Sequence, residues 1–86
     1  MALLSDREGF DKAAYRQACK DILSDVMKTA VYHEARGHWE IKETNREKIQ
    51  HAIEGAQFYQ QEAETQNGRA RYYAIEAALK AKIKEG

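Results

Sequence analysis

The sequence predicts an all-α fold, a three-helix bundle in which a long first helix packs against an antiparallel helical hairpin. Apolar residues recur at steps of three and four in three separate stretches, which is the period of an amphipathic helix. Helix-start and helix-stop residues bound these stretches, and the chain contains no proline. Its 86 residues are the size of one small domain, so we expect a single helical domain over residues 1–86.

The first helix is expected over residues 6–36. Ser5 and Glu8 have the spacing of a capping box, in which each side chain bonds the backbone amide of the other residue. Gly37 follows the stretch, and glycine is the usual residue just past a helix C-terminus. Between these ends, apolar residues recur every four positions, at Phe10, Ala14, Ala18, Ile22, Val26 and Ala30.

The apolar stripe of this first helix predicts contacts with more than one neighbour. At about 100° per residue, further apolar side chains widen the stripe to about half of the helix circumference. At about 1.5 Å per residue the helix is also on the order of 45 Å long, whereas the third is nearer about 25 Å. Unless the first helix breaks, part of its stripe projects beyond the hairpin. We therefore expect a homodimer or a hetero-complex, with self-association through Tyr15, Cys19, Leu23 and Met27.

Residues 37–44 are expected to form an extended linker. Trp39 and Ile41 alternate with charged neighbours, which is also the pattern of a short strand. A strand of this length would have no partner in an all-helical chain. We therefore expect Trp39 to pack on the end of the bundle.

Two further helices are expected over residues 45–66 and 69–84, joined at Asn67 and Gly68. Residues 44–47 again have the spacing of a capping box, and Asn and Gly tolerate the left-handed backbone that ends many helices. Because the connection is short, the two helices should be antiparallel neighbours. The last helix has a stripe of large apolar residues, formed by Tyr72, Ile75, Leu79 and Ile83.

Composition argues against several functional classes but does not exclude a local charged patch. The formal net charge is zero, which argues against a broad electrostatic attraction to nucleic acid or anionic lipid. One cysteine permits no intrachain disulfide and favours a reducing, cytoplasmic setting. The apolar start, residues 1–4, is too short for a signal peptide or a membrane span, so no membrane association is expected.

No catalytic or metal-binding motif emerges from the sequence. His33 and His38 resemble the H-E-x-x-H pattern of zinc proteases but lie five residues apart, so they would not share one helical face. His51 is on another predicted helix, which leaves no third ligand. The chain also lacks a nucleophile elbow, a phosphate-binding loop and a cysteine pair. We therefore expect no metal, no cofactor and no enzymatic activity.

The third helix carries the strongest candidate for a binding surface. Arg69, Tyr73, Lys80 and Lys84 share one outward face on a helical wheel. Arg69 and Arg71 lie in the predicted first turn, where positive charge opposes the helix dipole. These arginines either contact a partner or pair with Glu62 and Glu64 across the turn. On the second helix, Phe58 lies off the apolar stripe. It is either part of a contact surface or an ordinary exposed aromatic residue.

These features favour a small non-catalytic protein-interaction module that acts as an accessory or inhibitory subunit. Its predicted partner-binding residues are Phe58, Arg69, Tyr73, Lys80 and Lys84. The alternative is a nucleic-acid-binding regulator that uses the basic face of the third helix. The two differ in salt response, because binding through phosphates weakens steeply as salt rises.

Overall fold

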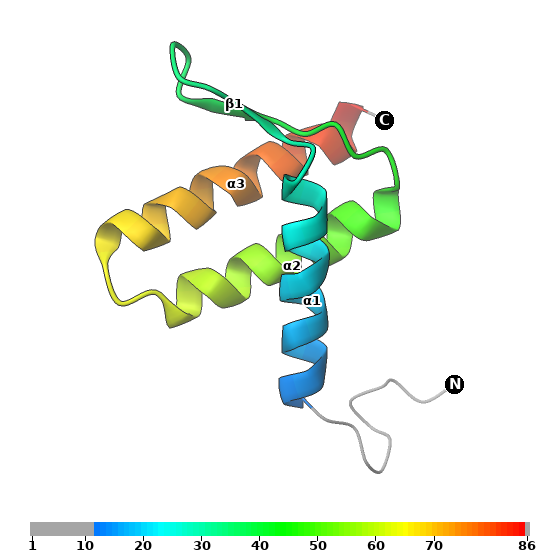
Figure 1. The fold of residues 1–86 in the computed structure, drawn as a ribbon, viewed down its shortest axis with the longest axis vertical. Helices are drawn as coiled ribbons and strands as arrows, with labels where there is room; N and C mark the ends of the chain where they lie inside the picture. The colour runs from blue at the N-terminus through cyan, green and yellow to red at the C-terminus, as the bar shows by residue number, and fades with distance from the viewer. Residues whose placement is uncertain (1–11, 86) are drawn as a thin grey trace.

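The computed structural model describes residues 12–85, and over this range the chain forms three helices and one two-stranded antiparallel sheet (Figure 1). Helical residues predominate, so the all-α class is confirmed in its broad form. The capping box expected at Ser5 lies outside the described residues. In chain order the elements are α1 (Lys12–Met27), β1 (Val31–His33), β2 (His38–Glu40), α2 (Arg46–Glu62) and α3 (Gln66–Glu85).

The first helix ends at Met27, so the prediction of a helix to residue 36 is wrong. The amide of Lys28 donates to two carbonyls of the last turn, and the hydroxyl of Thr29 donates to the carbonyl of Val26 at 3.3 Å. These bonds satisfy groups that a longer helix would have used. The following residues include β-branched and aromatic side chains, which favour a strand over a helix.

Residues 31–40 form a β-hairpin in place of the helix end and linker that the sequence suggested. Its cross-strand pairs are Val31 with Glu40, Tyr32 with Trp39, and His33 with His38. Gly37 adopts a φ of 59°, a conformation that glycine reaches without a steric cost. This glycine therefore serves the hairpin turn, and the short strand at Trp39 does have a partner.

The two remaining helices begin and end at different residues than expected. Asn45 caps α2, because its side-chain oxygen accepts from the amide of Lys48 at 3.2 Å. The helix ends at Glu62. The hydroxyl of Thr65 then accepts from the amide of Gly68 at 3.1 Å and starts α3. Asn67 and Gly68 therefore belong to the first turn of α3, and they do not form the turn between the helices.

The helices are arranged around α2. Figure 1 shows α2 and α3 side by side in opposite directions, as expected, with α1 crossing α2 and the hairpin lying over α3. Because α1 packs mainly on α2, the expected three-helix bundle is not confirmed in that form. The core between these elements is apolar, and its larger buried members are Leu23, Val26, Ile41, Ile49, Ile75 and Leu79.

The apolar stripe of α1 is mostly covered within the chain. Cys19 and Leu23 are buried, and Tyr15 and Met27 are half-buried. Cys19 and Leu23 thus pack inside the single chain, where α1 lies on α2, and self-association through the four predicted residues stays a prediction. None of the helices described here is long and apolar enough to cross a membrane.

Candidate functional site: an aromatic groove

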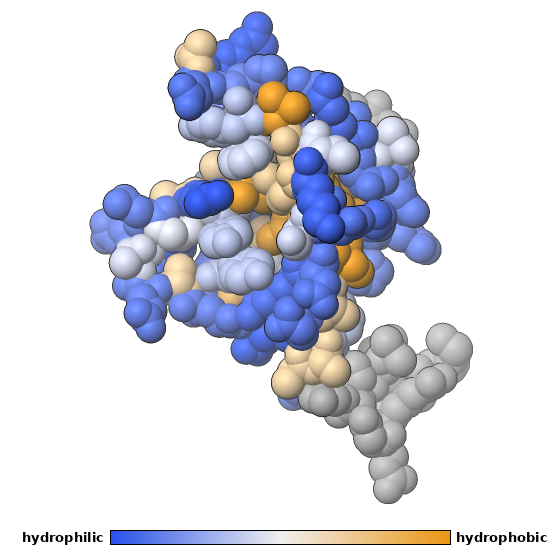
Figure 2. Space-filling model, in the orientation of Figure 1, coloured by the Kyte–Doolittle hydropathy of each residue, from blue (hydrophilic) through white to orange (hydrophobic). Residues whose placement is uncertain are grey.

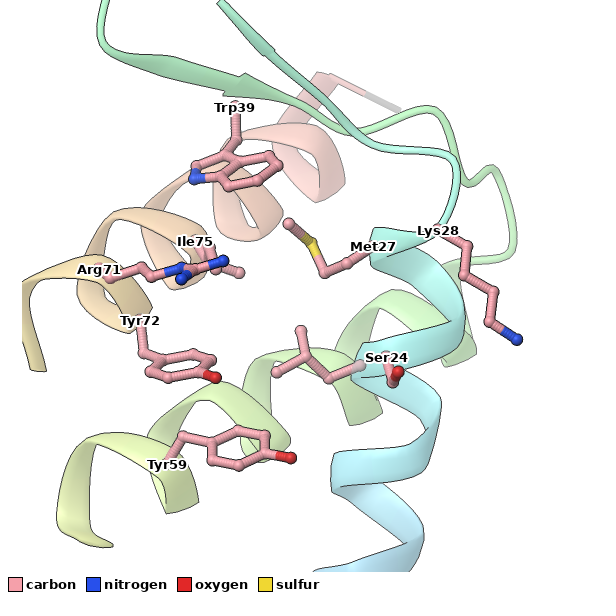
Figure 3. Close-up of a pocket in the computed structure, with 9 residues that line it drawn as sticks. Ser24, Met27, Lys28, Trp39, Tyr59, Arg71, Tyr72 and Ile75 are labelled. Carbon is pink, nitrogen blue, oxygen red and sulfur yellow. The ribbon is translucent and has the colours of Figure 1, made fainter. Parts of the chain in front are cut away.

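A groove of about 340 Å³ opens where the C-terminal end of α1, the hairpin, α2 and α3 meet (Figure 3). We call it the aromatic groove. Its apolar and aromatic lining is formed by Leu23, Met27, Trp39, Tyr59, Tyr72 and Ile75. Three polar or charged residues complete it, namely Ser24, Lys28 and Arg71. A mostly apolar concave surface with a few polar groups has the composition of a binding site.

The aromatic rings of the groove are held in place by contacts with their neighbours. Tyr59 of α2 and Tyr72 of α3 stack with ring centroids 4.6 Å apart and an interplanar angle of 14°. Trp39 packs against Tyr32 across the hairpin, with centroids 5.0 Å apart. The ammonium group of Lys20 lies 5.0 Å from the centroid of Tyr59. Rings fixed in this way lose little conformational freedom when a ligand binds.

Arg71 supplies positive charge inside the groove. Its exposed side chain extends from α3 into the space between Trp39 and Tyr72 (Figure 3). Among the described residues, no carboxylate pairs with this guanidinium group. Lys28 differs, because its side chain points away from the groove in Figure 3 and its charge helps to lower the pKa of the Asp25 carboxyl group.

Several other cations of the chain are neutralised by carboxylates. Glu62 pairs with Arg16 and with Lys20, so the predicted pairing of Glu62 with the arginines of α3 is wrong. Lys48 pairs with Asp25 and with Glu43 at the start of α2. Arg71 therefore stands apart from these exposed ion pairs, which tie the helices to one another.

The predicted outward face of α3 is exposed, as the helical wheel indicated. Tyr73 is 65% exposed, and Arg69, Lys80 and Lys84 are exposed beside it. Lys80 forms an ion pair with Glu76 at 2.8 Å, which reduces the positive charge of this face. These four residues do not line the aromatic groove, and their proposed role in partner binding stays a prediction.

Phe58 is explained by contacts inside the chain. It is half-buried, and its ring meets that of Tyr15 edge to face with centroids 6.4 Å apart. The guanidinium carbon of Arg16 lies 5.1 Å from the ring centroid. Phe58 is thus not a freely exposed aromatic, and it helps to fix α1 on α2.

Two of the three histidines are exposed in the hairpin. His33 and His38 face each other as a cross-strand pair, and Nε2 of His33 lies 2.8 Å from a carboxylate oxygen of Glu40. This contact holds the pKa of Glu40 below its usual range. Within residues 12–85, no group of three His, Cys, Asp or Glu residues is placed to hold a metal ion.

Glu76 is a buried carboxylate with three hydrogen-bond donors, namely Gln57 (2.9 Å), Gln60 (2.7 Å) and Lys80 (2.8 Å). Burial alone would raise the pKa of this carboxyl group. The three contacts outweigh burial and hold its pKa below the usual range. Glu76 is therefore ionised and joins α3 to α2.

Sequence reasoning missed the aromatic groove. The sequence predicts Tyr72 and Ile75 on the apolar stripe of the third helix, Trp39 at the end of the bundle, and Arg71 in the first turn of the third helix, but it does not bring the four residues together. The signal that could have located the hairpin is the β-branched and aromatic content of residues 29–32. Comparison with protein-family models, with curated proteins and with solved structures found no match for this chain.

Proposed function

We propose that this chain is a small protein-interaction module without catalysis of its own, which acts as an accessory or inhibitory subunit by binding a partner in the aromatic groove. The observation that carries the proposal is the combination of three aromatic residues with a guanidinium group that has no carboxylate partner in the described chain. Trp, Tyr and Arg are the side chains that most often dominate binding energy at protein interfaces.

The exposed hairpin places a further aromatic residue beside the groove. Tyr32 is 47% exposed and contacts Trp39, which lines the groove. Figure 2 shows apolar surface gathered in the hollow between the hairpin and the helices. Exposed apolar residues grouped at a concave surface, with polar residues around them, can mark a protein-interaction site.

The chemistry of the groove supports binding over catalysis. Among the described residues, no His, Asp, Glu or Cys lines it. The hydroxyl groups of Ser24, Tyr59 and Tyr72 therefore have no carboxylate or imidazole among the lining residues to act as a general base.

The proposal is tested by affinity capture with matched charge reversals on one helix. The wild-type chain, Arg71→Glu and Lys84→Glu are used as baits in a lysate of cells that express the protein, and the captured protein is then purified and titrated. We expect Arg71→Glu to lose the partner and Lys84→Glu to retain it. If Lys84→Glu loses the partner and Arg71→Glu retains it, binding in the groove is contradicted.

The second candidate is nucleic-acid binding through the outward face of α3. It is favoured by the exposure of Tyr73 next to Arg69 and Lys84, because an aromatic among cations suits stacked bases and phosphates. Lys80 contributes less, since Glu76 neutralises it. Binding of a single-stranded oligonucleotide that weakens steeply with salt and is lost in Tyr73→Ala would support this candidate.

A further inference from the structure

We infer that the partner segment presents a carboxylate beside a large apolar side chain, with the carboxylate on Arg71 and the apolar group against Trp39, Met27 and Tyr72. This inference rests on the proposed function, because it names the chemistry of what enters the same groove. It follows from the charge, the size and the surroundings of the groove.

Charge requires the carboxylate. The guanidinium group of Arg71 extends between two rings and has no carboxylate partner in the described chain. Any partner that covers the groove also takes this charge out of water, which is costly unless an anion replaces the lost hydration. A carboxylate matches the planar fork of arginine and can accept two parallel hydrogen bonds. A neutral segment could offer carbonyl oxygens to the guanidinium group but would bring no negative charge to compensate for the lost hydration.

Size and lining require the apolar neighbour. A volume of about 340 Å³ is at the small end of ligand sites. It suits one or two anchoring side chains better than a broad protein face. The half-buried side chains of Met27, Trp39 and Tyr72 surround the space into which Arg71 projects. An apolar side chain next to the acidic one would cover these groups and exclude water from the ion pair, which strengthens it.

The same groove is poorly suited to a polyphosphate. A protein that binds a nucleic-acid strand places a series of cations along the path of the phosphate backbone. Here the second cation, Lys28, points away from the groove and lies near Asp25. The formal net charge of zero supplies no wider attraction. The observations therefore favour a protein segment over an RNA or DNA strand.

Selection of short random peptides displayed on phage tests the inference on the full chain. Parallel selections use the wild-type chain, Arg71→Gln and Lys84→Gln, the last as a matched loss of one positive charge on the same helix. Selected peptides are synthesised with each Asp or Glu and with the matching Asn or Gln. Affinities are measured by calorimetry, and binding sites are mapped by amide chemical shifts.

We expect the wild type and Lys84→Gln to select peptides with an acidic residue next to Leu, Ile or Phe, and Arg71→Gln not to. Removing the charge on either partner should weaken binding by about tenfold or more. Peptides that map to the groove but carry no acid, or that bind Arg71→Gln equally well, would overturn this inference and leave the proposed function standing. If no peptide binds in the groove, or an oligonucleotide occupies it more tightly, both are overturned.

Discussion

The backbone of Cys19 in α1 lies directly against Gly55 of α2. A Cβ atom placed on Gly55 would stand 2.5 Å from the carbonyl oxygen of Cys19 and 3.2 Å from the Cβ of Leu23. This approach is closer than any residue with a side chain permits. It lets α1 bury its stripe on α2, and it places the C-terminal end of α1 where the hairpin and α3 can enclose the groove.

Replacing Gly55 with alanine should therefore destabilise the fold by about 2–3 kcal/mol, because helix backbones must separate to admit the methyl group. Helix propensity alone predicts the opposite sign, since alanine is favoured over glycine in a helix by about 1 kcal/mol. Chemical denaturation followed by circular dichroism measures the difference in unfolding free energy. Gly68→Ala is the control, because its nearest contact is the exposed hydroxyl of Thr65 at 3.2 Å, and it should change stability by less than about 1 kcal/mol. An unchanged or more stable Gly55→Ala chain would refute the close crossing.

The thiol of Cys19 should be unreactive in the folded chain. The side chain is fully buried, and burial raises the pKa of the thiol, so little thiolate is available. Reaction with a thiol-specific reagent should be slow under native conditions and fast in denaturant. Rapid native reaction, or an interchain disulfide formed by mild oxidation, would show that α1 is open at this position.

Glu76 should make stability dependent on acid pH. Its pKa in the folded state lies below the ordinary value of 4.5, so the unfolded state takes up the proton first as pH falls. The stabilisation of the fold by the ionised Glu76 carboxylate is therefore complete above the ordinary pKa of 4.5. It is lost as pH falls through the pKa of Glu76 in the folded state. At pH 7, Glu76→Gln should cost about 2 kcal/mol, as charged hydrogen bonds to a buried group do.

The measurement is the unfolding free energy of the wild type and of Glu76→Gln at a series of pH values. The difference between the two chains should shrink as the pH is lowered, because only the wild type loses this interaction on protonation. A difference that stays constant across the series would mean that the carboxylate of Glu76 is not what joins the two helices.

The spacing of apolar residues along the chain was enough to predict α2 and α3, but it did not predict the hairpin at residues 31–40. The apolar positions of α2 and α3 predict both helices, and the short connection between them predicts their antiparallel pairing. The step of four that runs through Val26 and Ala30 continued the helical pattern past the true end of α1, where Thr29 and the strand residues compete with it. Gly37 is compatible with either a helix end or a hairpin turn, so it could not decide between them.

The groove was beyond sequence reasoning because it depends on contacts between distant segments. Trp39 reaches it only because β2 packs on α3, and Tyr59 stacks on Tyr72 only because α2 and α3 lie side by side. Helical periodicity places Arg71 beside Tyr72 wherever α3 begins, but it does not show that Trp39 lines the same space. Thr65 caps α3, so Asn67 and Gly68 lie in its first turn.

The central claim is that a partner binds in the aromatic groove, and Trp39 reports on it directly because it is the only tryptophan in the chain. The measurement is the emission of Trp39 during titration with a tryptophan-free peptide selected by the wild-type chain. We expect a saturable change in Trp39 emission with a midpoint equal to the calorimetric dissociation constant, and a midpoint at least about tenfold weaker in Arg71→Gln. Calorimetric binding of that peptide with no change in Trp39 emission would contradict it.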